Sequence, residues 1–299
     1  MQTVKPKKIK KSVSEIVVYI IGGIFLLAIA MSYAGLFAWG LINCFKSVLD
    51  YAVDMVGLPP KPIFTNFTDV LVNLPMTKIT STGEVTYGVP IMLWNSLVFA
   101  FVRSVLAVIG PAMVAYPIAK YNFKGKHLLF TIALVDMLIP FGPNLGISLQ
   151  FHKWLGTFDN RLGNFMMAVP AFGFDFLLLH ASFKGISWTY AEAATIDGAS
   201  DFRIMTQIMF PMAFPTFVTI FMLKFAGLWN DYMTPIVWLP SYPTLMYGMY
   251  IFEQKSKTLF MGTPQVLAGL FITAVPTMIL YVFTQRFLKS GFMVGGLKG

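Results

Sequence analysis

The chain has 299 residues, of which 57% are hydrophobic and 12% charged, with a formal net charge of +9. An ordinary soluble domain has about a quarter charged residues, so these few charges cannot cover the surface of a water-soluble protein of this length. The composition therefore predicts a protein embedded in lipid. The single cysteine, Cys44, excludes an intramolecular disulfide and a multi-cysteine metal site.

The first predicted span covers residues 16–43, which include no Asp, Glu, Lys or Arg and can cross a hydrocarbon core of about 30 Å. A cleaved signal peptide is the alternative, but its apolar region would be only about 7–15 residues long. Five more apolar segments follow, so we expect an all-α polytopic membrane protein with six transmembrane helices: 16–43, 89–119, 128–150, 163–183, 212–239 and 264–287. Prolines inside these segments are predicted to be kinks and not span ends: Pro111, Pro140, Pro170 and Pro276.

Basic residues are concentrated in the N-terminal tail, the second and fourth connections and the C-terminal segment. Because Lys and Arg accumulate in cytoplasmic loops, this bias predicts that both termini lie in the cytoplasm, residues 1–15 as a basic tail and 290–299 as a C-terminal tail. The positive net charge then reports topology, and no nucleic-acid partner is expected because no basic patch with interleaved aromatic residues occurs.

Residues 44–88 form a long external loop between the first span and a predicted membrane core at 89–289, which includes the other five spans. Pro59, Pro60 and Pro62 precede a stretch in which Val70 and Leu74 favour packing. We expect an ordered cap or a partner surface, with a flexible linker as the alternative.

The fourth connection, residues 184–211, has the pattern of two short helices joined by a turn. Thr189 and Glu192 have capping-box spacing, so Thr189 is predicted to cap a helix that continues to Ile196. Gly198 accepts the left-handed backbone of a helix end, and Ser200 suits the start of a second helix. Such a helical knob suits insertion into a groove on a partner protein.

At these residues the sequence resembles the membrane subunits of ATP-binding-cassette (ABC) importers, whose signature is Glu-Ala-Ala, three residues, Gly, nine residues, Ile, one residue, Leu-Pro. The matching residues are Glu192, Ala193, Ala194, Gly198, Ile208 and Pro211, and Phe210 stands where the family usually has Leu. Further likeness to the carbohydrate branch is carried by four short stretches: Asp197-Gly198-Ala199, Asn95-Ser96-Leu97, Trp229-Asn230-Asp231 and the terminal Gly-Gly-Leu-Lys-Gly. The resemblance is closest to maltose-type and multiple-sugar permeases, and it implies the type I ABC importer permease fold.

The resemblance also implies a division of labour in a bacterial cytoplasmic membrane. This chain would pair with a second permease subunit, as a heterodimer, and with two ATPase subunits, while an extracellular binding protein delivers a sugar. ATP and Mg²⁺ would belong to the ATPases, since the sequence has no Gly-x-x-x-x-Gly-Lys-Ser/Thr loop, so the chain is expected to bind no cofactor and not to be an enzyme. The implied ATPase-coupling residues are Glu192, Ala193, Ala194, Asp197, Gly198, Ile208 and Pro211, with capping alone as the other interpretation of Glu192.

Ionisable residues inside membrane spans are costly and are therefore functional candidates. Here they are Arg103, Asp136, Asp175, Lys224 and Asp231. Arg103 is predicted to pair with Asp136 or Asp175, and Lys224 lies two helical turns from Asp231, on one face. Hydroxyl-directed groups beside aromatic rings suit a sugar, so we expect the solute path at Lys224, Trp229, Asn230, Asp231 and Tyr232; a contact between the two permease subunits is the alternative.

Other classes remain to be weighed. An ion-coupled secondary transporter would also have buried carboxylates, and an ABC permease for a non-sugar solute would share the signature. No Gly-x-Ser-x-Gly or His-Glu-x-x-His motif supports a membrane enzyme. The three histidines, His127, His152 and His180, lack ligand spacing, so no metal site is expected.

Overall fold

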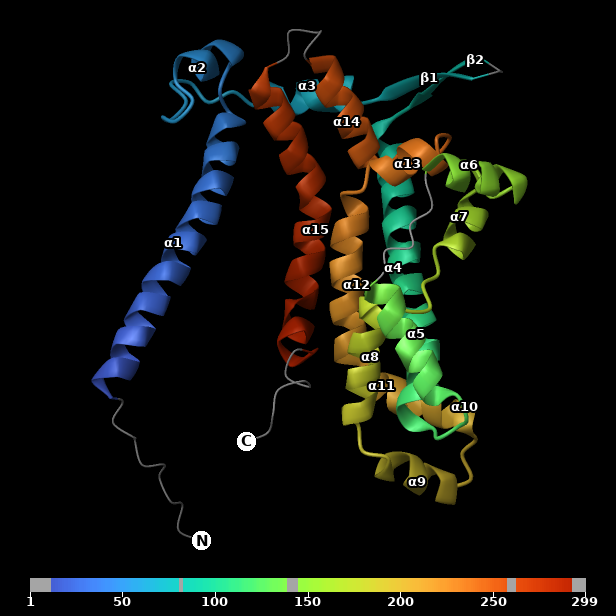
Figure 1. Cartoon of the computed structure of the whole chain (residues 1–299). Coiled ribbons are helices and arrows are strands. Elements are labelled where there is room, and N and C mark those ends of the chain that lie inside the picture. Colours follow the sequence, from blue (N-terminus) through green and yellow to red (C-terminus); the bar gives the residue numbers. More distant parts are fainter. Residues whose placement is uncertain (1–11, 81–82, 139–144, 257–261, 292–299) are drawn as a thin grey trace.

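The computed structural model describes residues 12–80, 83–138, 145–256 and 262–291. Within these ranges the chain is mostly helical, and its longest helices run roughly along one direction (Figure 1). A small ordered cap with a β-hairpin lies at one end, and a pair of short helices lies at the other. The two ends of the bundle therefore carry different structures.

The first long helix, α1 (Val13–Asn43), begins at a capping box. The Ser12 Oγ accepts a hydrogen bond from the Glu15 amide (3.3 Å), and the Glu15 carboxylate accepts one from the Ser12 amide (3.0 Å). Its apolar side chains are exposed along most of its length, and Figure 1 shows it apart from the other long helices. It contacts α15 (Thr263–Gly291) near the cap, where the rings of Phe37 and Phe271 lie 5.0 Å apart. A helix that is apolar on all sides and has few neighbours suits a lipid environment.

Three helices form the centre of the bundle with α15: α4 (Val89–Lys120), α8 (Phe174–Gly185) and α12 (Phe214–Trp229). A further helix, α5 (Lys126–Leu138), lies beside α4 and α8 and is mostly exposed. α4 packs against α8 and α12, and α12 packs against α15. One apolar cluster, around Tyr116, Phe183 and Met209, fills the end away from the cap. A second, around Met92 and Phe252, fills the end next to the cap.

Among the described residues, three helices are long and apolar enough to cross a membrane: α1, α4 and the Thr263–Phe287 part of α15. A bent pair, Asp201–Met212 with Phe214–Trp229, adds a fourth candidate with an angle of 70°. The third predicted segment includes α5 and α6 (Leu145–Trp154), and residues 139–144 between them lie outside the described residues. The fourth is a broken helix that comprises α7 (Arg161–Met167) and α8.

The prolines divide into two kinds. Pro111 and Pro276 lie inside helices, as predicted. Pro170 does not: it lies in the break between α7 and α8, so its prediction as a kink within one helix is wrong. Proline lacks the amide that a helix interior needs, and Gly173 just before α8 has a φ of +99°, which a continuous helix does not allow. Pro140 lies outside the described residues.

The segment after α1 is ordered and includes two β-strands. The described chain is therefore mostly helical, whereas the sequence predicted an all-α protein. It folds into α2 (Val48–Val53), α3 (Thr65–Asn73), β1 (Met76–Thr80) and β2 (Gly83–Tyr87). The strands are antiparallel, with Met76 opposite Tyr87, and are rich in the β-branched residues that favour strands. Asn66 ties α3 to the end of α1 by donating from Nδ2 to the carbonyls of Cys44 (2.7 Å) and Lys46 (2.8 Å). α3 packs on α15 and buries Val70 completely.

The helices that remain on the cap side are α13 (Met233–Trp238) and α14 (Leu245–Ser256). At the opposite end, α9 (Thr189–Ile196) and α10 (Asp201–Ile204) lead through the π-helix η1 (Met205–Met209) and α11 (Phe210–Met212) into α12. Figure 1 shows α9 at the end of the bundle opposite to the hairpin, with α10 between α9 and α11. The 184–211 segment thus forms one tip of the molecule.

Candidate functional site: the 184–211 loop and a polar pocket

The start of the first short helix differs from the prediction. α9 already includes Thr189, and its N-cap is Trp188, which gives no side-chain cap hydrogen bond. The Trp188 backbone is helical, with φ −69° and ψ −21°, so its carbonyl accepts hydrogen bonds from the amides of Ala191 (2.8 Å) and Glu192 (3.1 Å). The predicted capping box is therefore wrong. Glu192 is exposed, and no hydrogen bond to another described residue holds its carboxylate.

The end of α9 follows the prediction closely. The Ala199 amide donates to the Ala194 carbonyl (2.9 Å) and the Gly198 amide to the Thr195 carbonyl (3.0 Å), which is the Schellman arrangement. Gly198 has a φ of +79°, and a Cβ placed there would meet no atom within 4 Å. Glycine is therefore required here by the positive φ of the backbone, and not by a lack of space for a side chain. The surface above Gly198 is open.

The second short helix begins at Ser200, as predicted, where the side chain accepts a hydrogen bond from the Arg203 amide (3.4 Å). The π-helix η1 follows, and the Phe210 amide donates to the Met205 carbonyl five residues before it. Pro211 has no amide of its own and its ring crowds the preceding turn, which accounts for the wider turn. The bend of 70° at 213 then directs the chain into α12.

Two faces of this loop differ in exposure. Ala191, Ile204, Met205 and Met209 are buried against the bundle, together with most of Ala194. The opposite face is exposed and unites apolar and acidic side chains. We call it the knob face: Tyr190, Glu192, Ala193, Ile196, Asp197, Gly198 and Phe202. Ile196 is 87% exposed and Phe202 69% exposed, so the knob face is an apolar surface that this chain alone does not cover.

Contacts on the inner side fix the loop to the bundle. The Tyr121 ring lies 5.5 Å from Trp188 in an edge-on arrangement, and its hydroxyl donates to Asp201 Oδ1 (3.1 Å). Burial raises the pKa of Tyr121 above its ordinary value, so this hydroxyl stays protonated and remains a donor. The Lys120 ammonium donates to the Ile186 carbonyl. Lys120, the last residue of α4, and Tyr121, the residue after it, therefore hold the segment that joins α8 to α9.

Phe210, where the family signature usually has Leu, lies in an aromatic cluster. Its ring centroid is 5.2 Å from Phe217, 5.7 Å from Phe183 and 6.2 Å from Tyr116. These rings belong to α12, α8 and α4. The larger side chain thus joins three helices of the bundle at the point where the 184–211 loop returns to it.

The four predicted solute-path residues 229–232 do not share one face, because α12 ends at Trp229. The Trp229 side chain is 1% exposed, and its Nε1 donates to the Thr273 carbonyl (2.8 Å). Asn230 is exposed and donates to the Ala226 carbonyl (2.8 Å), while Tyr232 stacks on Tyr250 at 4.7 Å. Trp229 is therefore a core residue in this chain.

The predicted ion pairs are also different. Lys224 Nζ lies 2.7 Å from Asp175 Oδ2, so Asp175 pairs with Lys224 and not with Arg103. Asp136 is exposed on α5. Lys224 and Asp231 do not lie on one helix face, because Asp231 follows the end of α12 and accepts a hydrogen bond from the Thr234 amide (2.9 Å). Asp231 instead acts electrostatically on Arg103.

Sequence reasoning missed a polar pocket of about 200 Å³ beside the break between α12 and α13. Its lining comes from α4, α6, α7 and α13, with Ala168 just after α7: Arg103, Ser148, His152, Asn164, Met167, Ala168, Thr234 and Trp238. Within the described part of the chain, Arg103 Nη1 and Asn164 Oδ1 are buried without a hydrogen-bond partner. Arg103 lies roughly 20 Å along α4, near its middle. Only Arg103 was visible as a candidate in the sequence, because the polar side chains meet from four separate helices.

The comparisons with known proteins agree with this geometry. The model of the family "binding-protein-dependent transport system inner membrane component" matches residues 3–290. The probable starch degradation products transport system permease AmyC of Thermoanaerobacterium thermosulfurigenes is 29% identical over 86% of this chain and 89% of its own length. The arabinooligosaccharides transport system permease AraQ of Halalkalibacterium halodurans is 30% identical over 69% of this chain and 73% of its own.

A solved structure shows the same fold. One chain of a bacterial ABC transporter involved in the import of the acidic polysaccharide alginate is similar with a TM-score of 0.73, at 21% identity, over 95% of this chain and all of that one. These findings favour an ABC permease over an ion-coupled secondary transporter. The chain therefore belongs to the family of inner-membrane components of binding-protein-dependent transport systems.

Proposed function

We propose that this chain is one membrane subunit of an ATP-driven importer that carries a sugar or an oligosaccharide across the bacterial cytoplasmic membrane. The observation that carries the proposal is the 184–211 loop, whose knob face is open while its inner side is fixed to α4, α8 and α12. An exposed apolar and acidic surface on a firmly held helical unit suits a groove on a partner protein. The partners are two ATPase subunits, a second and different permease subunit, and an extracellular binding protein.

The coupling follows from the contacts of the loop. The knob face fits a cleft on an ATPase subunit, which alone holds ATP and Mg²⁺. When the ATPases close, the displacement passes through Tyr121, Trp188 and Phe210 to the helices that these rings contact. Because packed helices move as rigid bodies, the loop reorients the spans instead of bending. Glu192 has no capping role, so its carboxylate is available to the ATPase.

The same proposal includes the topology. Six spans and two cytoplasmic termini are supported by the positive-inside bias of the basic residues and by the position of the 184–211 loop at the end opposite to the cap (Figure 1). In the proposal, α5 with α6 and α7 with α8 are the third and fourth spans. Non-helical backbone at membrane depth is tolerated where it lines a water-filled cavity, and the polar pocket is lined by Met167 and Ala168 at the break after α7.

In the proposal, the solute path runs along the polar pocket. Four predicted path residues precede the pocket residue Thr234 by two to ten positions in the sequence: Lys224, Asn230, Asp231 and Tyr232. The pocket offers an unpartnered donor, Arg103 Nη1, and an unpartnered acceptor, Asn164 Oδ1. A sugar hydroxyl both donates and accepts, so a sugar satisfies both atoms. The names of the relatives, which refer to starch degradation products and arabinooligosaccharides, support a carbohydrate. The ordered cap at 44–88 faces the binding protein.

Reconstitution tests this function. The chain is co-expressed with its neighbouring permease and ATPase subunits, purified, and placed in liposomes with the binding protein, and uptake of labelled maltooligosaccharides and arabinooligosaccharides is measured. We expect uptake only when ATP is present on the side of the liposome membrane that carries the ATPase subunits. A proton gradient alone should give no uptake. Uptake by a proton gradient without ATP would contradict the proposal, and ATP-driven uptake of a non-sugar solute alone would contradict its carbohydrate part.

A further inference from the structure

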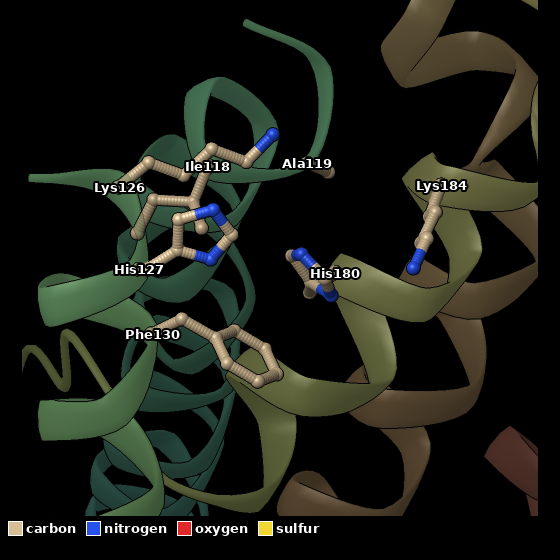
Figure 2. A pocket seen from close by; sticks show the side chains of 7 residues that line it. All are labelled: Ile118, Ala119, Lys126, His127, Phe130, His180 and Lys184. Carbon is tan, nitrogen blue, oxygen red and sulfur yellow. The ribbon is translucent and has the colours of Figure 1, made fainter. Parts of the chain in front are cut away.

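A second pocket, of about 250 Å³, lies between α4, α5 and α8 at the end that leads into the 184–211 loop. Figure 2 shows Lys126 and His127 on one side of it and His180 and Lys184 on the other. α8 ends at Gly185, directly after Lys184, so this pocket adjoins the segment that connects the bundle to α9. None of its residues belongs to the knob face or to the polar pocket around Arg103.

The pocket brings lysine and histidine side chains together from two helices, α5 and α8. Among the described residues that line it, two are lysines, two are histidines and none is a carboxylate. Lys126 and Lys184, from two different helices, both act electrostatically on His180. Groups of like charge that face one space repel each other, and an anion placed between them removes that repulsion. Phosphate oxygens suit lysine ammonium groups and imidazole N–H donors.

The rest of the lining is apolar. Ile118, Ala119 and Phe130 complete the pocket, and the Phe130 ring lies 4.8 Å from the His180 ring. Along α5, one and two turns beyond Phe130 on the same helix face, two apolar side chains are exposed: Leu134 and Met137. A ligand with an anionic head and apolar chains matches both features, whereas free phosphate matches only the first.

We propose that this pocket binds the phosphate of an anionic phospholipid of the cytoplasmic leaflet, with the acyl chains along the exposed face of α5. The inference rests on the proposed orientation, in which this end of the bundle lies at the cytoplasmic surface. Anionic lipids give that surface a negative potential, and basic pockets between transmembrane helices on this side bind lipid head groups. Bound lipid holds Lys126 of α5 and Lys184 of α8 together at the base of the coupling loop.

The test is native mass spectrometry of the purified transport complex in micelles that contain phosphatidylglycerol or phosphatidylcholine. We expect phosphatidylglycerol to be retained in preference to phosphatidylcholine. Lys184→Gln is the main variant because Lys184 is exposed and its replacement leaves the core intact. Loss of one lysine is expected to weaken phosphatidylglycerol binding about fivefold, which corresponds to about 1 kcal/mol. Lys184→Arg keeps the charge and retains the lipid.

Lys124→Gln is the matched control. Lys124 is an exposed lysine of the connection between α4 and α5, two residues before Lys126, but it does not line the pocket. Equal retention of both lipids, or an equal loss for Lys124→Gln and Lys184→Gln, would overturn the proposal. Inorganic phosphate and pyrophosphate are added as competitors, and displacement of the lipid by millimolar phosphate would assign the pocket to free phosphate instead. The measurement needs neither ATP nor solute, so a negative result leaves the transport proposal untouched.

Discussion

At the scale of single residues, Trp229 separates a structural role from solute contact. Its Nε1–H donates to the Thr273 carbonyl, and its ring stacks on Phe225 at 5.7 Å. Trp229→Phe keeps an aromatic ring but removes the donor, so we expect a loss of stability of about 1 kcal/mol and an unchanged KM for the solute. Thermal unfolding of the purified complex and uptake kinetics measure the two. A raised KM with unchanged stability would place Trp229 on the solute path.

The ion pair between Lys224 and Asp175 joins α12 to α8. Lys224→Met leaves the Asp175 carboxylate, on a residue that is only 8% exposed, without its counter-charge. Because the Lys224 side chain is 42% exposed and therefore screened, we expect a destabilisation of about 1 kcal/mol. Adding Asp175→Asn removes the unpaired charge and restores part of the unfolding temperature. A double variant less stable than Lys224→Met alone would show that the pair is not the interaction that matters here.

At the scale of elements, the hydrogen bond from Tyr121 to Asp201 joins the end of α4 to the 184–211 loop, and the proposed mechanism uses it to transmit movement between them. Tyr121→Phe keeps the ring contact with Trp188 and removes only the hydroxyl. We expect unchanged recovery of the ATPase with the complex, but about fivefold fewer solute molecules transported per ATP hydrolysed, the equivalent of about 1 kcal/mol. Asp201→Ala should give the same loss, and the double variant no further loss. Additive losses would mean that the two residues act independently.

Local chemistry made the ends of the short helices predictable. The turn at Gly198 and the cap at Ser200 depend on residues next to each other in the sequence, and both predictions are confirmed. The predicted cap of α9 was wrong by one position, because Trp188, with a helical backbone, is the N-cap in place of the expected Thr189. The signature sequence located the loop, whereas its fixation by Tyr121 depends on a residue 80 positions before Asp201.

Features that depend on tertiary packing were not predictable in the same way. The break after Trp229 separates residues that one continuous helix would have placed on one face. It also separates Asp231, which acts electrostatically on Arg103, from Lys224, which forms an ion pair with Asp175. The polar pocket unites Ser148, Asn164 and Thr234, which have no common sequence pattern. Composition predicted the membrane environment, but not which apolar segments are continuous helices.

At the scale of the whole molecule, the proposed topology places the hairpin outside and the α4–α5 connection inside. Cys44 is fully buried and burial raises the pKa of its thiol to about 11, so it reacts slowly, and Cys44→Ala removes the remaining background. In that background we expect Glu84→Cys to react with a membrane-impermeant maleimide in intact spheroplasts. Lys124→Cys should react only after permeabilisation. The reverse pattern, or labelling of both in intact spheroplasts, would contradict the orientation.

The central claim is that the knob face docks onto an ATPase subunit, and Gly198 is an exposed residue of that face. Gly198→Asp adds a charged side chain where the surface is open, and it also strains a backbone with a φ of +79°. Gly156→Asp is the matched control, because Gly156 has a φ of +68° and equally open space but follows α6 on the cap side. Both variants should insert into the membrane normally.

The most direct measurement is the amount of ATPase that co-purifies with each tagged variant, relative to the unaltered permease. We predict that Gly198→Asp loses at least tenfold, a cost of about 1.4 kcal/mol, while Gly156→Asp recovers the ATPase in full. Full recovery with Gly198→Asp, together with normal ATP-driven uptake, would contradict the account.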